Sequence, residues 1–560
     1  MSIFFIFSLY TIAQSVSEKP FSKSDTLRGT ITPERAWWDL LHYAIYIQPN
    51  IPQKSVEGNV AIQFKAIQPG KILQIDLQQP LIIDSVLEVG NKQQFNSLSF
   101  KRTGNIALIN FNHTIVTGKK ATIIVYYHGK PREAVRPPWD GGVSWKNDQQ
   151  GNPFVATSCQ GLGASVWWPC KDHQADEPND GLSISVRIPD TLVEVSNGQL
   201  KKVITHTDHT KTWTWEVKNP INNYGVSMNI GKYERIKDTF NGEAGVLNLN
   251  YYILSAHKDS ALQQLKQIKQ MLSCFEYWMG KYPFYEDGYK LVEVPYLGME
   301  HQSNVAYGNK FKNGYLGRDL SGTGWGLNWD FIIIHESGHE WFGNNITSKD
   351  IADMWIHEGF TNYTETLFTQ WLNGKEAANE YNYGSRKNIL NDKPIIAPFG
   401  VNAMGSGDMY SKASAMIHSI RMGMNDDIQF RKLLRAMNSN FYHKTVTTED
   451  VEQLISKYTG YPVKQIFNQY LRNTTIPILE YYLAADKKML NYRYTNAIDG
   501  FNMPLIIACG NTFKKIVPKN NEWQQLQLTI EEATALQISN IEKYFYLQLK
   551  ERKELVIKAY

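Results

Sequence analysis

The chain has 560 residues, of which 42% are hydrophobic and 20% charged, and its 58 basic and 54 acidic side chains give a net charge of +4. The charges are nearly balanced, and the sequence has no block of five or six like charges. The charge pattern therefore does not support binding to nucleic acid or to a membrane surface. We expect a globular chain with about three or four domains and a large core.

The N-terminus begins with an apolar run, Met1 to Ala13, which is too short to span a bilayer. Its length and the small residues near its end predict a signal peptide, and a buried N-terminal strand is the alternative. The polar residues 14–27 are expected to form a flexible lead-in. The predicted signal peptide implies a secreted or periplasmic location. No later segment is apolar for 18 residues, so we expect no stable membrane insertion. Export would permit a disulfide between Cys159 and Cys170, but the sequence does not decide whether this bond forms.

Residues 28–250 consist of short alternating runs of apolar and polar residues, broken by turn residues. This spacing predicts a large antiparallel β domain. The expected strands include residues 42–47, 60–64, 107–111, 121–127, 182–189 and 213–217.

The spacing of apolar residues changes after residue 250. From Lys258 to Met279 apolar residues recur at intervals of three and four, which indicates an amphipathic helix. Similar runs cover Glu358 to Leu372 and Lys412 to Met422, and another opens at Thr447 with a capping-box signature. We therefore expect a mostly helical domain over residues 251–475.

The C-terminal part, residues 476–560, returns to strand-like runs at 479–483, 490–494 and 505–509. They predict a small β-sandwich. The expected fold class is multidomain α+β.

One short motif, His335-Glu336-Ser337-Gly338-His339, carries chemistry in its spacing. On a helix, residues i and i+4 lie on one face, so His335 and His339 can bind one ion, with Glu336 beside whatever that ion binds. The pattern predicts a zinc site with a base next to it. A helix with a half-buried polar face is the alternative.

A hydrolytic zinc usually has a third protein ligand and leaves its fourth position to water. Glu358 begins the next expected helix, nineteen positions after His339, and an antiparallel return could bring it back to the two imidazoles. His357 is a rival ligand, but Glu358 completes a known ligand set. A solvated glutamate near a helix N-terminus is the alternative for Glu358.

Several motifs agree with this ligand set: Tyr296 to His301, Ser158 to Gln160, Trp168 to Asp172 and Tyr410 to Lys412. Together with the spacing of His335, Glu336, His339 and Glu358, they resemble the gluzincin aminopeptidases, the family of aminopeptidase N and leukotriene hydrolase. The similarity extends over nearly the whole chain. It implies a thermolysin-like catalytic domain with one zinc ion per chain.

The resemblance also implies roles for single residues. A zinc-bound water activated by Glu336 would attack the peptide carbonyl, and Tyr410 would donate a hydrogen bond to the charged oxygen. Glu300 would bind the free α-ammonium of a peptide substrate, within a motif whose Gly298 and Met299 also bind substrate. Gln160 would add a carbonyl acceptor for the amine. An ordinary hydrogen bond is the alternative for Gln160, and one more packed aromatic for Tyr410.

A ligating histidine usually donates its second nitrogen to a carboxylate. Glu365 is a candidate partner, because it lies two turns beyond Glu358 on the same helical face, and a solvated helix face is the alternative.

Three departures from the family pattern concern local geometry. His301 stands where the family usually has Asn, Leu297 where it has Gly, and Ala413 where it has Gly. The chain also ends before a C-terminal helical-repeat domain, so the cleft is expected to be open or to be closed by a second subunit of a homo-oligomer.

The expected function is zinc-dependent removal of N-terminal residues from peptides that have a free N-terminus. An epoxide hydrolase, an endopeptidase and a catalytically silent binding protein on the same scaffold are the alternatives.

Overall fold

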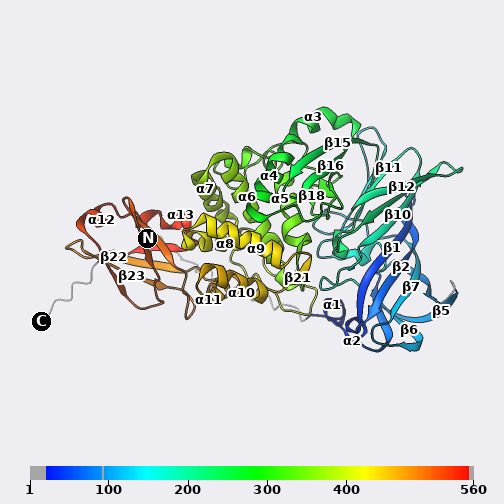
Figure 1. Cartoon of the computed structure of the whole chain (residues 1–560), viewed down its shortest axis with the longest axis horizontal. Coiled ribbons are helices and arrows are strands. Elements are labelled where there is room, and N and C mark those ends of the chain that lie inside the picture. Colours follow the sequence, from blue (N-terminus) through cyan, green and yellow to red (C-terminus); the bar gives the residue numbers. More distant parts are fainter. Residues whose placement is uncertain (1–20, 91–93, 554–560) are drawn as a thin grey trace, which may run out of the picture.

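The computed structural model describes residues 21–90 and 94–553. A β-rich N-terminal part and a C-terminal part with a small sheet lie on opposite sides of a helical middle part (Figure 1). This arrangement confirms the expected α+β fold class. The predicted signal peptide lies outside the described residues, so it and the secreted or periplasmic location stay predictions.

The N-terminal part is built on a ten-stranded sheet. Each pair of neighbouring strands is antiparallel except β1 and β10, which run parallel. Alternate residues of β10 from Leu182 to Ile188 are buried, as the sequence pattern predicts. In sheet order the strands are β12 (Gln199–Thr205), β13 (Thr210–Val217), β10 (Leu182–Pro189), β1 (Trp38–Asn50), β2 (Ser55–Ala66), β7 (Lys120–Gly129), β4 (Ile82–Val89), β5 (Phe95–Thr103), β6 (Ile106–Ile115) and β3 (Gly70–Asp76).

A second sheet of this part leads toward the helical part. Its order is β11 (Val193–Ser196), β14 (Met228–Gly231), β9 (Pro153–Ser158) and β8 (Gly142–Asn147). The end of β9 matters for function because Gln160 follows it two residues later.

The segment before β1, residues 22–32, forms what we call the N-terminal strap. It contains helix α1 (Lys23–Gly29) and is followed by α2 (Pro33–Ala36), so the expected flexible lead-in is wrong for residues 23–27. A capping box at Ser22 starts α1, and the Thr30 hydroxyl donates a hydrogen bond to the Gly400 carbonyl at 2.6 Å. Polar composition suggested disorder, but this segment is fixed by contacts with residues far away in the sequence.

The four cysteines all lie in the described part of the chain, and all four are buried and free. The disulfide between Cys159 and Cys170 that was left open is therefore absent from this structure. Cys159 instead donates a hydrogen bond from Sγ to the Tyr224 carbonyl at 3.4 Å.

The helical part carries a five-stranded sheet at its border with the N-terminal part. In sheet order it contains β15 (Tyr233–Gly242), β16 (Gly245–Leu254), β17 (Tyr289–Glu293), β19 (Val305–Tyr307) and β18 (Gly298–Met299). The predicted division between residues 250 and 251 falls inside β16. The change from strand to helix periodicity marks the end of an element, whereas β16 already pairs with β17 and shares its core with the helices.

The helices of the helical part enclose one large hydrophobic core. The expected helix from Lys258 to Met279 is divided at Leu265, and the capping box at Thr447 is confirmed. The helices are α3 (Lys258–Gln264), α4 (Lys266–Met279), α5 (Phe331–Gly338), α6 (Trp355–Asn373), α7 (Lys375–Ser385), α8 (Ser411–Met424), α9 (Asp427–Asn440), α10 (Thr448–Thr459) and α11 (Lys464–Leu471). Two short strands, β20 (Ile346–Ser348) and β21 (Lys444–Val446), pair with each other in parallel.

The C-terminal part has a four-stranded sheet, a separate hairpin and two short helices, and the three expected strand runs are all present. Its hydrophobic residues belong to the same core cluster as the helices of the middle part. Its elements are β22 (Ile478–Leu483), β23 (Met489–Thr495), β24 (Leu505–Cys509), β25 (Thr512–Ile516), β26 (Gln524–Gln527), α12 (Ile530–Thr534), α13 (Ile541–Tyr544) and β27 (Gln548–Glu551).

None of the helices in the described part of the chain combines the length and the apolar character that crossing a bilayer requires.

The N-terminal strap depends on Arg35, which is fully buried and pairs with Asp76 at 2.5 Å. Arg35 also donates hydrogen bonds to the backbone carbonyls of the strap. We expect Arg35→Met to lower the free energy of unfolding by about 3–5 kcal/mol, because Asp76 would stay buried without its cation. Urea unfolding measures this change. Lys54→Met, which removes a half-exposed pair with Glu133, should leave the midpoint nearly unchanged, and an equal effect of both substitutions would contradict the role of Arg35.

Candidate active site

Helix α5 presents the two histidines. Its N-terminus is capped by the Asp330 side chain, which accepts hydrogen bonds from the backbone of Ile332 and Ile333. These apolar residues are buried, so the helix is fixed in rotation within the core. His335 and His339, one turn apart, therefore face the same way.

The chain leaves α5 through a sharp kink at Phe342 and Gly343. Gly343 has φ +123°, and a Cβ on it would lie 3.1 Å from His339 Nδ1, so both the backbone and the space require glycine. The kink places the Phe342 carbonyl 3.0 Å from the same nitrogen. His339 is thereby held with its Nε2 free for a metal ion.

Helix α6 brings Glu358 to the histidines. It approaches α5 closely at Gly338, where a Cβ would lie 2.6 Å from Thr364 Oγ1. Glu358 Oε2 lies 3.6 Å from His335 Nε2 and 3.4 Å from His339 Nε2. The helix–loop–helix return expected from the sequence is thus present.

These three residues fit a zinc ion. Their ligand atoms lie within 4.8 Å of one another, and all three side chains are buried. Glu358 Oε2 has no hydrogen-bond partner in the described part of the chain, which is costly for a buried carboxylate unless a cation binds it. Two imidazoles and one carboxylate are an established zinc donor set with an open fourth position.

The rival ligand His357 points elsewhere. Its Nε2 accepts a hydrogen bond from the Ser348 backbone at 2.8 Å, and its Nδ1 lies 3.2 Å from the Tyr224 hydroxyl. Because both ring nitrogens have partners away from the cluster, Glu358 is the better third ligand.

Electrostatics inside the cluster follow from burial and close contact. Burial alone would lower the pKa of His335, but its contacts with Glu358 and Glu365 raise this pKa well above its usual value. Burial would likewise raise the pKa of Glu358, yet the imidazoles of His339 and His335 hold it below its usual value. The site therefore favours positive charge between these groups.

Glu365 holds His335 in place, as the sequence suggested. Its Oε1 lies 2.8 Å from His335 Nδ1 and accepts a hydrogen bond from Asn362 at 2.9 Å. Its Oε2 accepts a hydrogen bond from the Tyr381 hydroxyl at 2.6 Å. Sequence reasoning missed Tyr381, since no local pattern on α7 distinguishes it from the many other tyrosines.

Glu336 lies beside the cluster and lines the same cleft. A Cβ on Gly298 would come within 2.8 Å of Glu336 Oε1, so glycine leaves room for this carboxylate. Burial raises the pKa of Glu336 to about 7. Gly298 and Met299 form β18, the last strand of its sheet, which pairs with β19 on one edge and lines the cleft.

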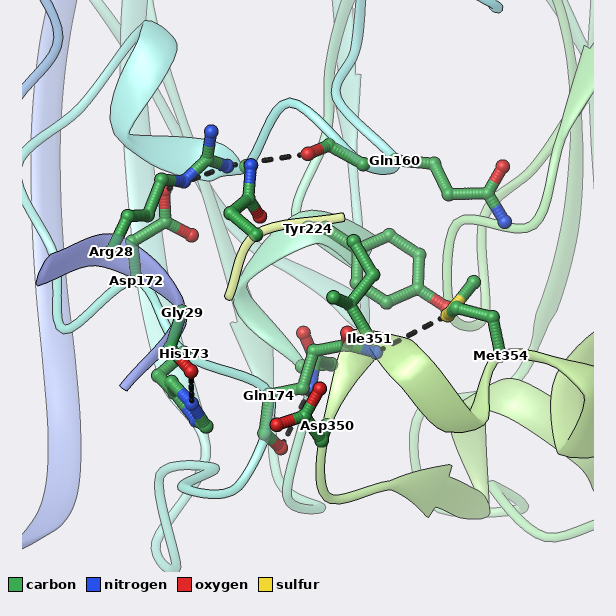
Figure 2. Close-up of a pocket in the computed structure, with 14 residues that line it drawn as sticks. Arg28, Gly29, Gln160, Asp172, His173, Gln174, Tyr224, Asp350, Ile351 and Met354 are labelled. Atoms are coloured by element: carbon green, nitrogen blue, oxygen red, sulfur yellow. Dashed lines mark hydrogen bonds and ion pairs between the residues drawn. The ribbon is translucent and has the colours of Figure 1, made fainter. Parts of the chain in front are cut away.

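Glu300 and Gln160 meet beside the zinc ligands. The amide nitrogen of Gln160 donates hydrogen bonds to Glu300 Oε1 at 2.6 Å and to Glu358 Oε1 at 2.8 Å. The two carboxylates orient the amide with its nitrogen toward them, and the role of the Gln160 carbonyl as an acceptor for a substrate amine stays a prediction. Figure 2 shows the Gln160 side chain extending away from Arg28 and Asp172, which lie at the other end of a small cavity.

Tyr410 precedes helix α8 and stacks on His335, with ring centroids 6.0 Å apart. Burial, together with the carboxylates of Glu358, Glu300 and Glu336, raises the pKa of Tyr410 well above its usual value. The hydroxyl therefore stays protonated and can donate a hydrogen bond.

Two departures from the family pattern have structural counterparts. Ala413 lies against Gly359, where a Cβ would come within 2.6 Å of the Ala413 Cβ, so the glycine is supplied by the facing helix α6. His301 is fully buried, and neither ring nitrogen has a hydrogen-bond partner among the described residues. Burial lowers the pKa of His301 to about 3.

The cleft around these residues has a volume of about 510 Å³ and is lined by both the N-terminal and the helical parts. Four glutamates line it, and no lysine or arginine is among its described lining residues. The cleft is therefore a cation-attracting site.

Two imidazoles and a carboxylate around one ion, with a second carboxylate beside them, define the class of mononuclear zinc sites with an open position. The Peptidase M1 N-terminal domain matches residues 40–224, and the Peptidase family M1 domain matches residues 264–470. The chain belongs to peptidase family M1. The predicted zinc cofactor is confirmed by this family and by the donor set.

The sequence identity to the relatives is low, but the similarity extends over most of this chain. Aminopeptidase M1-B of Oryza sativa subsp. japonica is 20% identical over 458 residues, which cover 78% of this chain and 50% of the relative. Aminopeptidase N of Lactobacillus helveticus is 22% identical over 466 residues, which cover 80% of this chain and 52% of the relative. The chain thus spans about half the length of the curated relatives it matches.

Among solved structures, an M1 zinc metallopeptidase from Deinococcus radiodurans is similar with a TM-score of 0.67 and 18% identity. The match covers 79% of this chain and 95% of that one, and it shows that the two share a fold.

The hydrogen bond from Tyr381 to Glu365 gives a test of how His335 is held. We expect Tyr381→Phe to weaken zinc binding about 10-fold, because partners of this kind typically contribute 10-fold to 100-fold in metal affinity. Competition with a chromophoric chelator measures the affinity. Tyr383→Phe on the same helix, where the tyrosine is exposed, should bind zinc as the wild type does. Equal affinity in all three proteins would contradict the role of Tyr381.

Proposed function

We propose that the chain is a zinc-dependent aminopeptidase, which removes N-terminal residues from peptides. The observation that carries this proposal is the buried carboxylate of Glu300, which lies within 4.8 Å of ligand atoms of Glu336 and His339. A carboxylate this close to the metal ligands suits a small cation on the substrate, and a free α-ammonium is that cation. The names of the M1 relatives support the proposal.

Zinc bound by His335, His339 and Glu358 would polarise a peptide carbonyl and lower the pKa of water. Glu336 takes the proton of the attacking water on its carboxylate and gives it to the leaving amine. Burial favours the protonated form of Glu336, which helps its carboxyl group hold the proton between these two steps.

Other residues position the substrate. Glu300 binds the ammonium group and so places the first peptide bond next to Glu336. The free edge of β18, with Gly298 and Met299, offers backbone groups to an extended peptide. Tyr410 donates its hydroxyl hydrogen to the carbonyl oxygen as negative charge develops there.

Support also comes from a structural neighbour, since one structure of the Deinococcus radiodurans enzyme holds the substrate Tyr-Ser-Ala. No specific observation favours the alternatives. The complete donor set and Glu336 speak against a silent binding protein, and the position of Glu300 speaks against an endopeptidase.

The role of Glu336 as base is tested by Glu336→Gln. We expect this variant to keep one zinc per chain and to lose at least about 10²-fold in kcat, since general-base catalysis contributes 10²-fold to 10⁴-fold. Elemental analysis and the hydrolysis of leucine p-nitroanilide measure the two quantities. Turnover at the wild-type rate would remove Glu336 from the reaction.

The role of Glu300 is tested with paired substrates. Wild-type protein should hydrolyse leucine p-nitroanilide and reject its N-acetylated form, because the blocked nitrogen carries no charge for Glu300 to bind. Glu300→Ala should raise KM for the free-amine substrate about 10-fold or more, since hydrogen bonds to charged groups contribute about 1.5–3 kcal/mol. Equal hydrolysis of both substrates by the wild type would indicate an endopeptidase instead.

A further inference from the structure

One end of the cleft is apolar, and it adjoins the residues that bind the ammonium group. Gly161 follows Gln160, and a Cβ built on Gly161 would lie 3.2 Å from the methyl carbon of Met404. Met404 and Trp139 line the same cleft as Gln160 and Glu300. Met404 is thus linked to Glu300 through the Gln160–Gly161 segment, since the Gln160 amide donates a hydrogen bond to Glu300.

Trp139 is 70% exposed, which is unusual for so large an apolar side chain. Its turn is closed by the next residue: the Asp140 carboxylate accepts hydrogen bonds from the backbone of Val135 at 2.7 Å and of Arg136 at 2.8 Å. Gly141 also donates a hydrogen bond back to the Pro138 carbonyl at 3.2 Å. These hydrogen bonds thus fix the backbone of the turn that carries Trp139.

Met404 is 40% exposed and comes from a loop that is held at several points. The Gly400 backbone donates to Asp350 at 2.9 Å, and the N-terminal strap contacts the same loop through Thr30 and through the Asp25 carbonyl. The loop therefore fixes one apolar wall of the cleft, and the turn at Trp139 supplies another.

The first side chain of a peptide branches from the carbon that carries the ammonium group. The Gln160 amide is hydrogen-bonded to Glu300, and Met404 lies against Gly161, the next residue, so a side chain branching beside Glu300 can extend toward Met404. Trp139 lines the same cleft. Covering these exposed apolar surfaces is favourable, and aromatic rings stack well on indole and thioether groups. Asp140, the carboxylate next to Trp139 in the described chain, already accepts hydrogen bonds from two backbone donors and lies 3.7 Å from Arg132, so it is not available to a basic side chain.

We propose, on the basis of the aminopeptidase function above, that Trp139 and Met404 form the subsite for the substrate's N-terminal side chain. The preferred peptides then begin with a large apolar or aromatic residue, such as phenylalanine or leucine. Peptides that begin with alanine, arginine or glutamate are poorer substrates.

The test uses zinc-loaded protein and p-nitroanilides of phenylalanine, leucine, alanine, arginine and glutamate. Wild type should have its highest kcat/KM for phenylalanine and leucine. Trp139→Ala and Met404→Ala should each lower kcat/KM for phenylalanine about 10-fold, mainly through KM, and leave alanine within about 2-fold, because contacts in an apolar pocket discriminate by 10-fold to 200-fold. Trp139→Phe should restore much of the loss.

Val135→Ala is the matched control, because Val135 lies in the same turn, is 79% exposed and is absent from the cleft lining. It should keep the wild-type selectivity. An unchanged ratio of phenylalanine to alanine in both alanine variants would overturn the proposal, as would a wild-type preference for arginine, glutamate or alanine.

A binding measurement separates this subsite from the proposed reaction. Titration calorimetry with phenylalaninamide and alaninamide should show tighter binding of phenylalaninamide to wild type, and loss of the difference in Trp139→Ala. If no anilide is hydrolysed but this binding difference is found, the aminopeptidase function fails while the subsite stands. Equal binding of the two amides by wild type would reject the subsite, whatever the activity.

Discussion

The contact of the Glu358 carboxylate with His335 and His339 is the constraint on which the rest of the site depends. One carboxylate oxygen lies within 3.6 Å of both Nε2 atoms and has no hydrogen-bond donor of its own in the described chain. Such a group can stay ionised inside a core only when positive charge lies beside it. The close approach of α5 and α6 at Gly338, and the kink at Gly343, are the backbone features that make this contact possible.

The N-terminal part completes this arrangement from outside the helical part. Gln160 bridges Glu300 and Glu358, so one amide group connects Glu300, the proposed ammonium site, to a zinc ligand across the border between the two parts. The strap at residues 22–32 acts at the same border, because it joins the β-rich part to the loop that carries Met404. A short segment near the N-terminus therefore fixes a wall of the cleft far from it in sequence.

Patterns of neighbouring residues in the sequence correctly predicted features that depend on contacts within a single helix or strand. The spacing of His335 and His339, the alternation in β10 and the capping box at Thr447 each involve neighbours within one element, and all are present. Contacts between segments far apart in the sequence could not be predicted in this way. The hydrogen bond from Tyr381, the direction of the Gln160 amide and the order in the strap all depend on partners that no local spacing reveals. The misplaced boundary at residue 250 has the same origin, because a domain is defined by its shared core.

Charge balance in the cleft gives a physical reason for the proposed requirement that a substrate has a free amine. Glu300, Glu336 and Glu358 gather around two imidazoles, and zinc brings only two positive charges to these three carboxylates. In a buried, low-dielectric site the remaining negative charge is unfavourable unless a further cation or a proton arrives. The ammonium group of a peptide can supply that charge at Glu300, whereas an acetylated N-terminus leaves the carboxylate buried and uncompensated. The proposed selectivity for the N-terminus would then follow from completing the charge balance of the zinc site itself.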